Sequence, residues 1–448
     1  MFEVDCLKQL TKKEILFFGF TLFSMLFGAG NLIFPAYLGN AAGDNVWQAV
    51  TGFIISDAGL AILGFIAIAN AGTSDILANR VHSTFAFLFP LAIYLAIGPG
   101  LAIPRAGSLA YEMGIKPFLP HTGTAASVGL LVFTIIFFSI VFWFAKSPSK
   151  LVDRVGKILT PILLILIFTV FVKSLFMDAV PLKNAVSPYK ENPVIRGFLD
   201  GYQTMDGLCA FIYGIIFTNL FTVKKITNRS LQIKYLISFG LISGVLLSIC
   251  YIIIAYLGTK AIIPGTVDHG AVVLSIVMTQ LIGNSGTILL AVLFSVACLS
   301  VCIGLVSSCA QYFTTMFSKI SYIQWVLLLC VASGVVANLG LSQILKVSVP
   351  ILGFLYPIAI TLMILGILHS WLPSYSRPVY VITISMVGLF SLLEMINSTI
   401  FNGEFNPYLL WIPLQTDGFG WITIGGIGFV LGSIAGKILP NTGHTNTA

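Results

Sequence analysis

The chain has 448 residues, of which 57% are hydrophobic and only 9% are charged, and its mean hydropathy is +1.00. Soluble domains carry about 25% charged residues, so this composition excludes a soluble globular protein and predicts a polytopic membrane protein. The net charge of +7 does not indicate nucleic acid as a partner, because lysine and arginine collect in the cytoplasmic loops of membrane proteins.

Apolar runs predict twelve membrane-spanning helices, since a helix needs about 20 apolar residues to cross a bilayer. Their expected limits are 15–39, 46–69, 83–112, 125–146, 155–177, 195–222, 234–259, 286–316, 321–340, 343–369, 378–400 and 418–439. A further apolar stretch, 269–284, predicts a re-entrant or interfacial helix on the outer side. No short apolar run ends in a small-residue cleavage site, so we expect no removable signal peptide.

The basic residues orient these spans. With the N-terminus inside, fifteen of them fall on the inner side and six on the outer side. This bias predicts that residues 1–14 and the tail 440–448 are both cytoplasmic. Six of the seven cysteines lie in apolar runs, where cysteine behaves as a small hydrophobe. We therefore expect no disulfide and no metal site built from cysteine.

The first predicted span is interrupted in its middle by Phe27-Gly28-Ala29-Gly30-Asn31. A second interruption, from Gly201 to Gly207, lies inside the sixth span. Backbone that is not helical is tolerated at membrane depth only where protein or a wet cavity satisfies it. Two broken spans at corresponding positions are the pattern of secondary transporters built from repeats, although a single kinked helix can be purely structural.

The spacing of the two breaks predicts two units of five helices each, over 15–177 and 195–369. Five is an odd number, so the second unit must enter the membrane from the opposite side. The expected fold is thus an all-α membrane protein with a 5+5 inverted repeat, like the carriers of the LeuT type. The last two helices, within 378–439, lie outside the repeat.

The ends of the broken helices predict a site for a zwitterion. A helix that stops leaves free carbonyls with a partial negative charge, and one that starts leaves free amides with a partial positive charge. The carboxylate of an amino acid fits the amides near Gly30 and Asn31. Its ammonium group fits the carbonyls before Gly28 and near Gly201.

Several motifs then resemble one family, the bacterial branched-chain amino acid carriers, which form the leucine/isoleucine/valine:cation symporter family. The resemblance covers nearly the whole chain, and its longest motifs lie in the first and sixth spans. The matching stretches are Phe27–Pro35, Gly39–Trp47, Ile97–Arg105, Gly201–Asp206, Ala297–Ser300 and Ile303–Leu305.

This resemblance implies a LeuT-type fold with discontinuous first and sixth helices, in a bacterial inner membrane. It implies sodium- or proton-coupled uptake of leucine, isoleucine and valine, with no other cofactor. Together with the breaks, it leads us to expect a substrate site formed by Gly28, Ala29, Gly30, Asn31, Tyr94, Gly201, Tyr202, Thr204 and Asp206. For Tyr94 and Tyr202, simple packing is the alternative. Nothing in the sequence indicates an obligate protein partner.

The same resemblance implies a sodium site between the first break and the eighth span. Its ligands would be the backbone carbonyls of Ser24, Phe27 and Ala297 and the hydroxyl of Ser300. A second hydroxyl position of the family's fold is Val301 here, which weakens that expectation. The alternative for Ser300 is a hydroxyl bonded to its own preceding turn.

Charged residues at membrane depth are expensive and usually face the interior. Asp206 follows the second break and either balances a cation, carries a proton or caps the second half-helix. Asp57 lies in the middle of the second span and is protonated, paired with Arg105 or Lys346, or part of a proton path. Arg105 either snorkels to the interface or forms a gate salt bridge.

These features together predict a symporter of branched-chain amino acids that works by alternating access. The nearest alternative keeps the fold and carries another small neutral amino acid or a nucleobase. A membrane enzyme needs a reactive constellation of side chains that we do not find in the sequence, and a channel would pass current without substrate coupling.

Overall fold

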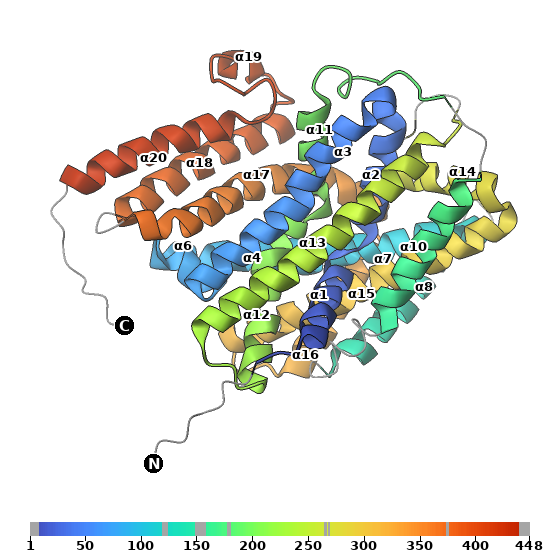
Figure 1. Ribbon diagram of the computed structural model, residues 1–448, viewed down its shortest axis with the longest axis horizontal. Coiled ribbons are helices and arrows are strands. Elements are labelled where there is room, and N and C mark those ends of the chain that lie inside the picture. The colour runs from blue at the N-terminus through green and yellow to red at the C-terminus, as the bar shows by residue number, and fades with distance from the viewer. Residues whose placement is uncertain are drawn as a thin grey trace. The chain divides into compact units, whose positions relative to one another are not determined.

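The computed structural model describes residues 9–118, 124–147, 158–176, 181–263, 267, 269–372 and 376–438, apart from the side chains of 124–127 and 284. All regular elements in these ranges are helices (Figure 1), which confirms the all-α class. The main ones are α1 Lys12–Leu26, α2 Ala29–Ala42, α3 Val46–Ile54, α4 Leu60–Ala71, α5 Ser74–Asn79, α6 Ser83–Leu95, α7 Ala102–Gly114, α8 Thr124–Ala145, α10 Thr160–Ser174, α11 Pro193–Gly201, α12 Asp206–Val223, α13 Arg229–Thr259, α14 Gly270–Ile282, α15 Asn284–Met316, α16 Tyr322–Ala337, α17 Leu341–Leu368, α18 Ser376–Thr399, α19 Asn406–Leu409 and α20 Gly420–Ile438.

Nine helical segments of the described residues are long and apolar enough to cross a membrane, and three more apolar helices have 10–17 residues. One of the nine, Ala29–Ala71, joins the second half of the predicted first span to the predicted second span, because Gly43–Asn45 continues the chain as a single tight helical turn. The membrane class is therefore confirmed, while the number of twelve spans stays a prediction.

Part of the predicted topology lies outside the described residues. This holds for residues 1–8, for the start of the fifth span, for Cys6, for the basic residues Lys8, Lys150, Arg154 and Lys157, and for the tail 440–448. The orientation of the termini thus stays a prediction. The six cysteines in the described part are buried and free.

The chain divides into two compact units, Met1–Phe65 with Tyr94–Ser348 and Ile66–Ile93 with Val349–Ala448. Both predicted breaks lie in the first unit. There α13 lies alongside α2, and α11 lies alongside α3 (Figure 1). In the second unit α18 and α20 pack closely, because Gly428 and Gly432 of α20 face the backbone of Thr383 and Val379. The two units do not coincide with the two predicted repeats, whose inverted arrangement stays a prediction.

Glycines hold α11 against the second span in the first unit. A Cβ atom on Gly52 would overlap the carbonyl of Val194, and one on Gly197 would overlap the carbonyl of Ala49. Gly201, the last residue of α11, lies against the side chain of Ser56 in the same way. Small residues at these points let the two backbones touch, and this contact places the second break beside the middle of the second span.

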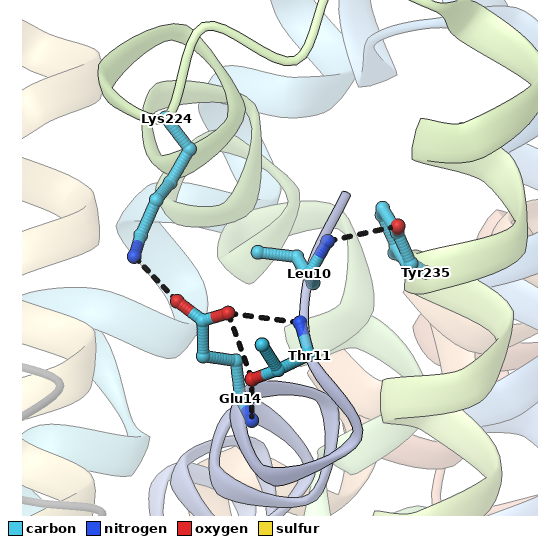
Figure 2. Close-up of polar contacts among 5 residues, drawn as sticks. All are labelled: Leu10, Thr11, Glu14, Lys224 and Tyr235. Atoms are coloured by element: carbon cyan, nitrogen blue, oxygen red, sulfur yellow. Dashed lines mark hydrogen bonds and ion pairs between the residues drawn. The ribbon is translucent and has the colours of Figure 1, made fainter. Parts of the chain in front are cut away.

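Polar contacts tie the start of α1 to the ends of two other helices (Figure 2). Thr11 caps α1 and forms a capping box with Glu14, whose carboxylate also lies 2.7 Å from the ammonium of Lys224, just after α12. The amide of Leu10 donates to the hydroxyl of Tyr235 on α13 at 3.0 Å. A partly exposed ion pair contributes at most about 1 kcal/mol, so this contact can break and re-form when helices move.

We expect Gly197→Ala to destabilise the protein, because the new methyl group must push α11 away from α3. Overpacking of this kind costs about 1–3 kcal/mol. The measurement is the thermal denaturation of the detergent-purified protein. Gly353→Ala is the matched control, since a Cβ on that helical glycine meets nothing within 4 Å. Equal denaturation temperatures for the two variants would contradict the close packing of these helices.

Candidate functional site

The first break interrupts the helix where the sequence predicts it. Helix α1 ends at Leu26, Phe27 is extended with φ −67° and ψ 94°, and α2 begins at Ala29. The side chain of Asn31 turns back and accepts a hydrogen bond from the amide of Gly28 at 3.0 Å. Gly28 has no room for a side chain, because a Cβ would lie 2.8 Å from a methyl group of Val301 on α15. The bond from Gly28 to Asn31 and the contact with Val301 therefore hold the interruption of the first span in place.

The second break separates α11 from α12. One tight turn, Tyr202–Thr204, follows α11, and Met205 adopts the left-handed conformation with φ 75° before α12 begins at Asp206. A residue other than glycine in this conformation is strained, and such residues cluster at functional sites. The helix cap is Met205, and it makes no side-chain capping bond. The interpretation of Asp206 as the cap of this half-helix is therefore wrong.

The two breaks meet through the side chain of Asn31. Its amide nitrogen lies 2.8 Å from a carboxyl oxygen of Asp206 and 2.6 Å from the hydroxyl oxygen of Tyr251 on α13. Asn31 and Asp206 are each 1% exposed. The backbones are also close, since a Cβ on Gly30 would lie 3.2 Å from the Cα of Thr204. Segments that are 175 residues apart therefore form one buried junction.

Asp57 joins this junction from the second span. The span is not a regular α-helix there, because residues Ile55–Gly59 form a wider π-helical turn, a feature that often marks functional sites. The carboxyl group of Asp57, also 1% exposed, is hydrogen-bonded to the hydroxyls of Thr204 and Tyr251. The alternative pairing with Lys346 is not seen, since that lysine is exposed.

Arg105 on α7 is held inside the protein against the second break. Its side chain donates to the carbonyl of Gln203 at 2.7 Å and to that of Thr204 at 3.4 Å, and its guanidinium lies 5.7 Å from the centroid of the Phe34 ring. Only 3% of the residue is exposed, so the prediction that it snorkels to the interface is wrong. The arginine instead satisfies carbonyls that the break leaves without helical partners.

The two candidate tyrosines make packing contacts. The ring of Tyr94 stacks on Tyr312 with 3.8 Å between centroids, and its hydroxyl donates to the carbonyl of Ile212 at 3.2 Å. Tyr202 lies in the tight turn of the second break and contacts Phe198, with 5.5 Å between ring centroids. Tyr202 thus belongs to the junction, whereas the contacts of Tyr94 are with α12 and α15.

The candidate cation ligands lie where α15 passes the first break. Val301 covers Gly28, and a Cβ on Gly304 would lie 3.1 Å from Met25. The hydroxyl of Ser300 donates to the carbonyl of Ala297 at 2.9 Å. This bond to its own preceding turn is the alternative to a role in cation binding. Ser24 is fully buried, and its hydroxyl has no hydrogen-bond partner among the described residues. The cation site at these four positions stays a prediction, and Val301 carries a methyl group where the family's fold has a second hydroxyl.

Four helix ends and three ionisable side chains converge at this junction. Helices α1 and α11 end there, and α2 and α12 begin there, so both partial charges that a zwitterion needs are present. The carbonyl of Gly201 already accepts from the hydroxyl of Thr204 at 2.6 Å, and that of Met25 accepts from Tyr213 at 2.6 Å. No cluster of three or more metal-binding side chains occurs in the described part of the chain. The helix ends therefore bring both signs of partial charge to one buried place.

Comparisons with known proteins agree with this geometry. Residues 11–439 match the family described as "Branched-chain amino acid transport protein". The chain is 41% identical to the branched-chain amino acid permease BraB of Bacillus subtilis, over 95% of this chain and 96% of that protein. It is 33% identical to the branched-chain amino acid permease BrnQ of Escherichia coli K12, over 97% and 99% of the two chains.

A solved structure shows the same fold. Mhp1, a transporter of the nucleobase-cation-symport-1 family in a closed conformation with bromovinylhydantoin bound, matches with a TM-score of 0.58 over 98% of both chains, at 13% sequence identity. At this identity the likeness concerns the fold alone. The family match and the full-length relatives show that the chain belongs to the family of branched-chain amino acid transport proteins.

Proposed function

We propose that this protein is a secondary symporter that takes up leucine, isoleucine and valine across the bacterial inner membrane by alternating access. The observation that carries the proposal is the buried junction of two broken spans, with Asn31 linking one break to Asp206 of the other at 2.8 Å. The relatives, which are named as permeases for branched-chain amino acids, support the choice of substrate.

The junction supplies partners for both charged groups of an amino acid. The substrate carboxylate binds the free amides of Ala29, Gly30 and Asn31 at the start of α2. The ammonium group binds carbonyls at the end of α1, before Gly28, and at the second break near Gly201. Tyr202, Thr204 and Asp206 complete this proposed site, and Tyr94 is a more distant candidate.

An apolar pocket for the side chain accounts for the expected selectivity. One methylene group contributes about 0.8 kcal/mol, so leucine, isoleucine and valine compete with one another at similar concentrations. Polar and charged side chains are rejected, because burying them without partners is costly. The likeness to Mhp1 concerns the fold alone, so it does not favour a nucleobase as cargo.

The proposed topology follows the sequence. Twelve spans, two inverted repeats over 15–177 and 195–369, and two added helices within 378–439 place both termini, 1–14 and 440–448, in the cytoplasm. Support comes from the two broken spans and from the excess of basic residues on the predicted inner side. The coupling ion is Na⁺ or H⁺, and the protein needs no cofactor or obligate protein partner.

We expect Gly30→Leu to abolish leucine uptake while the protein still inserts into the membrane. A Cβ at this position would lie 2.9 Å from a guanidinium nitrogen of Arg105 and 3.2 Å from the Cα of Thr204, so the two breaks must separate. The measurement is uptake of labelled leucine by cells with equal amounts of membrane-inserted protein. Gly426→Leu, at an exposed position with nothing within 4 Å of a Cβ, is the control. Normal uptake by Gly30→Leu would contradict the proposed site.

A sodium ion, if it is the coupling ion, binds the carbonyls of Ser24, Phe27 and Ala297 and the hydroxyl of Ser300. We expect Ser300→Ala to raise the sodium concentration for half-maximal uptake several-fold, with little effect on expression. Ser308→Ala is the matched control, since Ser308 is equally buried on α15 and also donates to its preceding turn, at 2.9 Å. Identical sodium titrations for the two variants would remove Ser300 from the site, as would uptake that does not respond to sodium.

A further inference from the structure

We propose that Asp57 and Asp206 form a carboxyl pair that binds one transported proton, so that substrate entry is coupled to protonation of the junction itself. This inference rests on the proposed function as a symporter and assigns the coupling site within it. Both residues are almost completely buried, and their carboxyl groups are linked through the side chains of Tyr251 and Asn31. They come from two different spans, the π-helical turn of the second and the first residue of α12.

The hydrogen bonds around the pair show that it must hold a proton. Tyr251 donates its hydroxyl proton to Asp57 and accepts from the amide nitrogen of Asn31. That same amide nitrogen donates to Asp206. The hydroxyl of Thr204 lies against both Asp57 and the carbonyl oxygen of Gly201, and it has one proton to donate. An ionised carboxylate only accepts hydrogen bonds, so both contacts are satisfied only when Asp57 carries a proton and donates it to Thr204.

Charge balance points to a single proton in this state. Arg105 interacts electrostatically with Asp206, and the pair with one proton carries one negative charge, so the buried cluster is neutral. Loss of that proton leaves one negative charge without compensation, which is expensive in a dry interior. The titratable and charged groups that face the pair are Arg105 from α7, Tyr251 from α13, and Cys209 and Tyr213 from α12. Asp200 on α11 is not counted among these groups, because its carboxylate forms an ion pair with Arg196 at 2.9 Å.

The position of the pair couples the proton to helix movement. With the proton bound, these hydrogen bonds join the second span to the second break and to the start of α12. Without it, the two carboxylates repel one another across the same network. Asn31 connects this contact to the amide of Gly28 at 3.0 Å, next to the amides proposed for the substrate carboxylate. When the proton binds, one carboxylate oxygen gains an O–H bond. The same O–H bond breaks when the proton leaves on the other side of the membrane.

Proteoliposomes with purified protein test this inference. Two assays are run without sodium, namely leucine counterflow at equal pH and leucine accumulation driven by an inwardly directed pH gradient. One pH unit corresponds to about 1.36 kcal/mol, so one coupled proton supports about tenfold accumulation. We expect Asp57→Asn to keep counterflow and to lose the accumulation. Glu394→Gln, an acid of α18 that accepts from Gln415 at 2.7 Å, is the control and accumulates leucine like the wild type.

Accumulation by Asp57→Asn at the wild-type level would overturn the inference. So would a wild type that shows counterflow but no response to the pH gradient, while the proposed transport function would stand. Absence of leucine counterflow in the wild type would instead refute the proposed function. If Asp57→Asn loses counterflow as well, leucine-driven proton entry into weakly buffered wild-type proteoliposomes decides. Entry of one proton with each leucine supports the pair as its carrier, and entry of leucine without protons overturns it.

Discussion

The hydrogen bond between Asn31 and Asp206 is the interaction on which the rest of the site depends. It joins a helix start in the first span to a helix start in the sixth, at 2.8 Å and away from solvent. Broken helices at membrane depth leave backbone groups that lipid cannot satisfy. This junction satisfies part of them with Asn31, Arg105 and Thr204, and leaves helix ends with opposite partial charges close together.

Close packing makes this junction possible. Gly197 and Gly201 bring α11 against the second span, and Gly28 lets α15 approach the first break. The same contacts bring Asp57 to the second break. The pair formed by Asp57 and Asp206 therefore depends on the glycines that position these helices. At the periphery, the start of α1 is held by the partly exposed ion pair between Glu14 and Lys224, which contributes little to stability.

The sequence predicts the backbone of this site better than its side-chain network. Glycine, proline and amide residues inside apolar runs indicate both breaks, since they are poor helix formers in lipid. The π-helical turn at Asp57 and the role of Tyr251 could not be predicted, because they depend on contacts between residues more than a hundred positions apart. For Arg105 the sequence leaves snorkelling and a gate salt bridge open, because its partners in the structure are carbonyls freed by a break about a hundred positions away.

A structure of the protein with leucine bound tests the central claim most directly. We predict that the carboxylate and ammonium groups of leucine contact the backbone of residues 27–31 and 201–207, with both segments still unwound. Leucine bound elsewhere in the protein, or either segment wound into a continuous helix around it, would contradict the account.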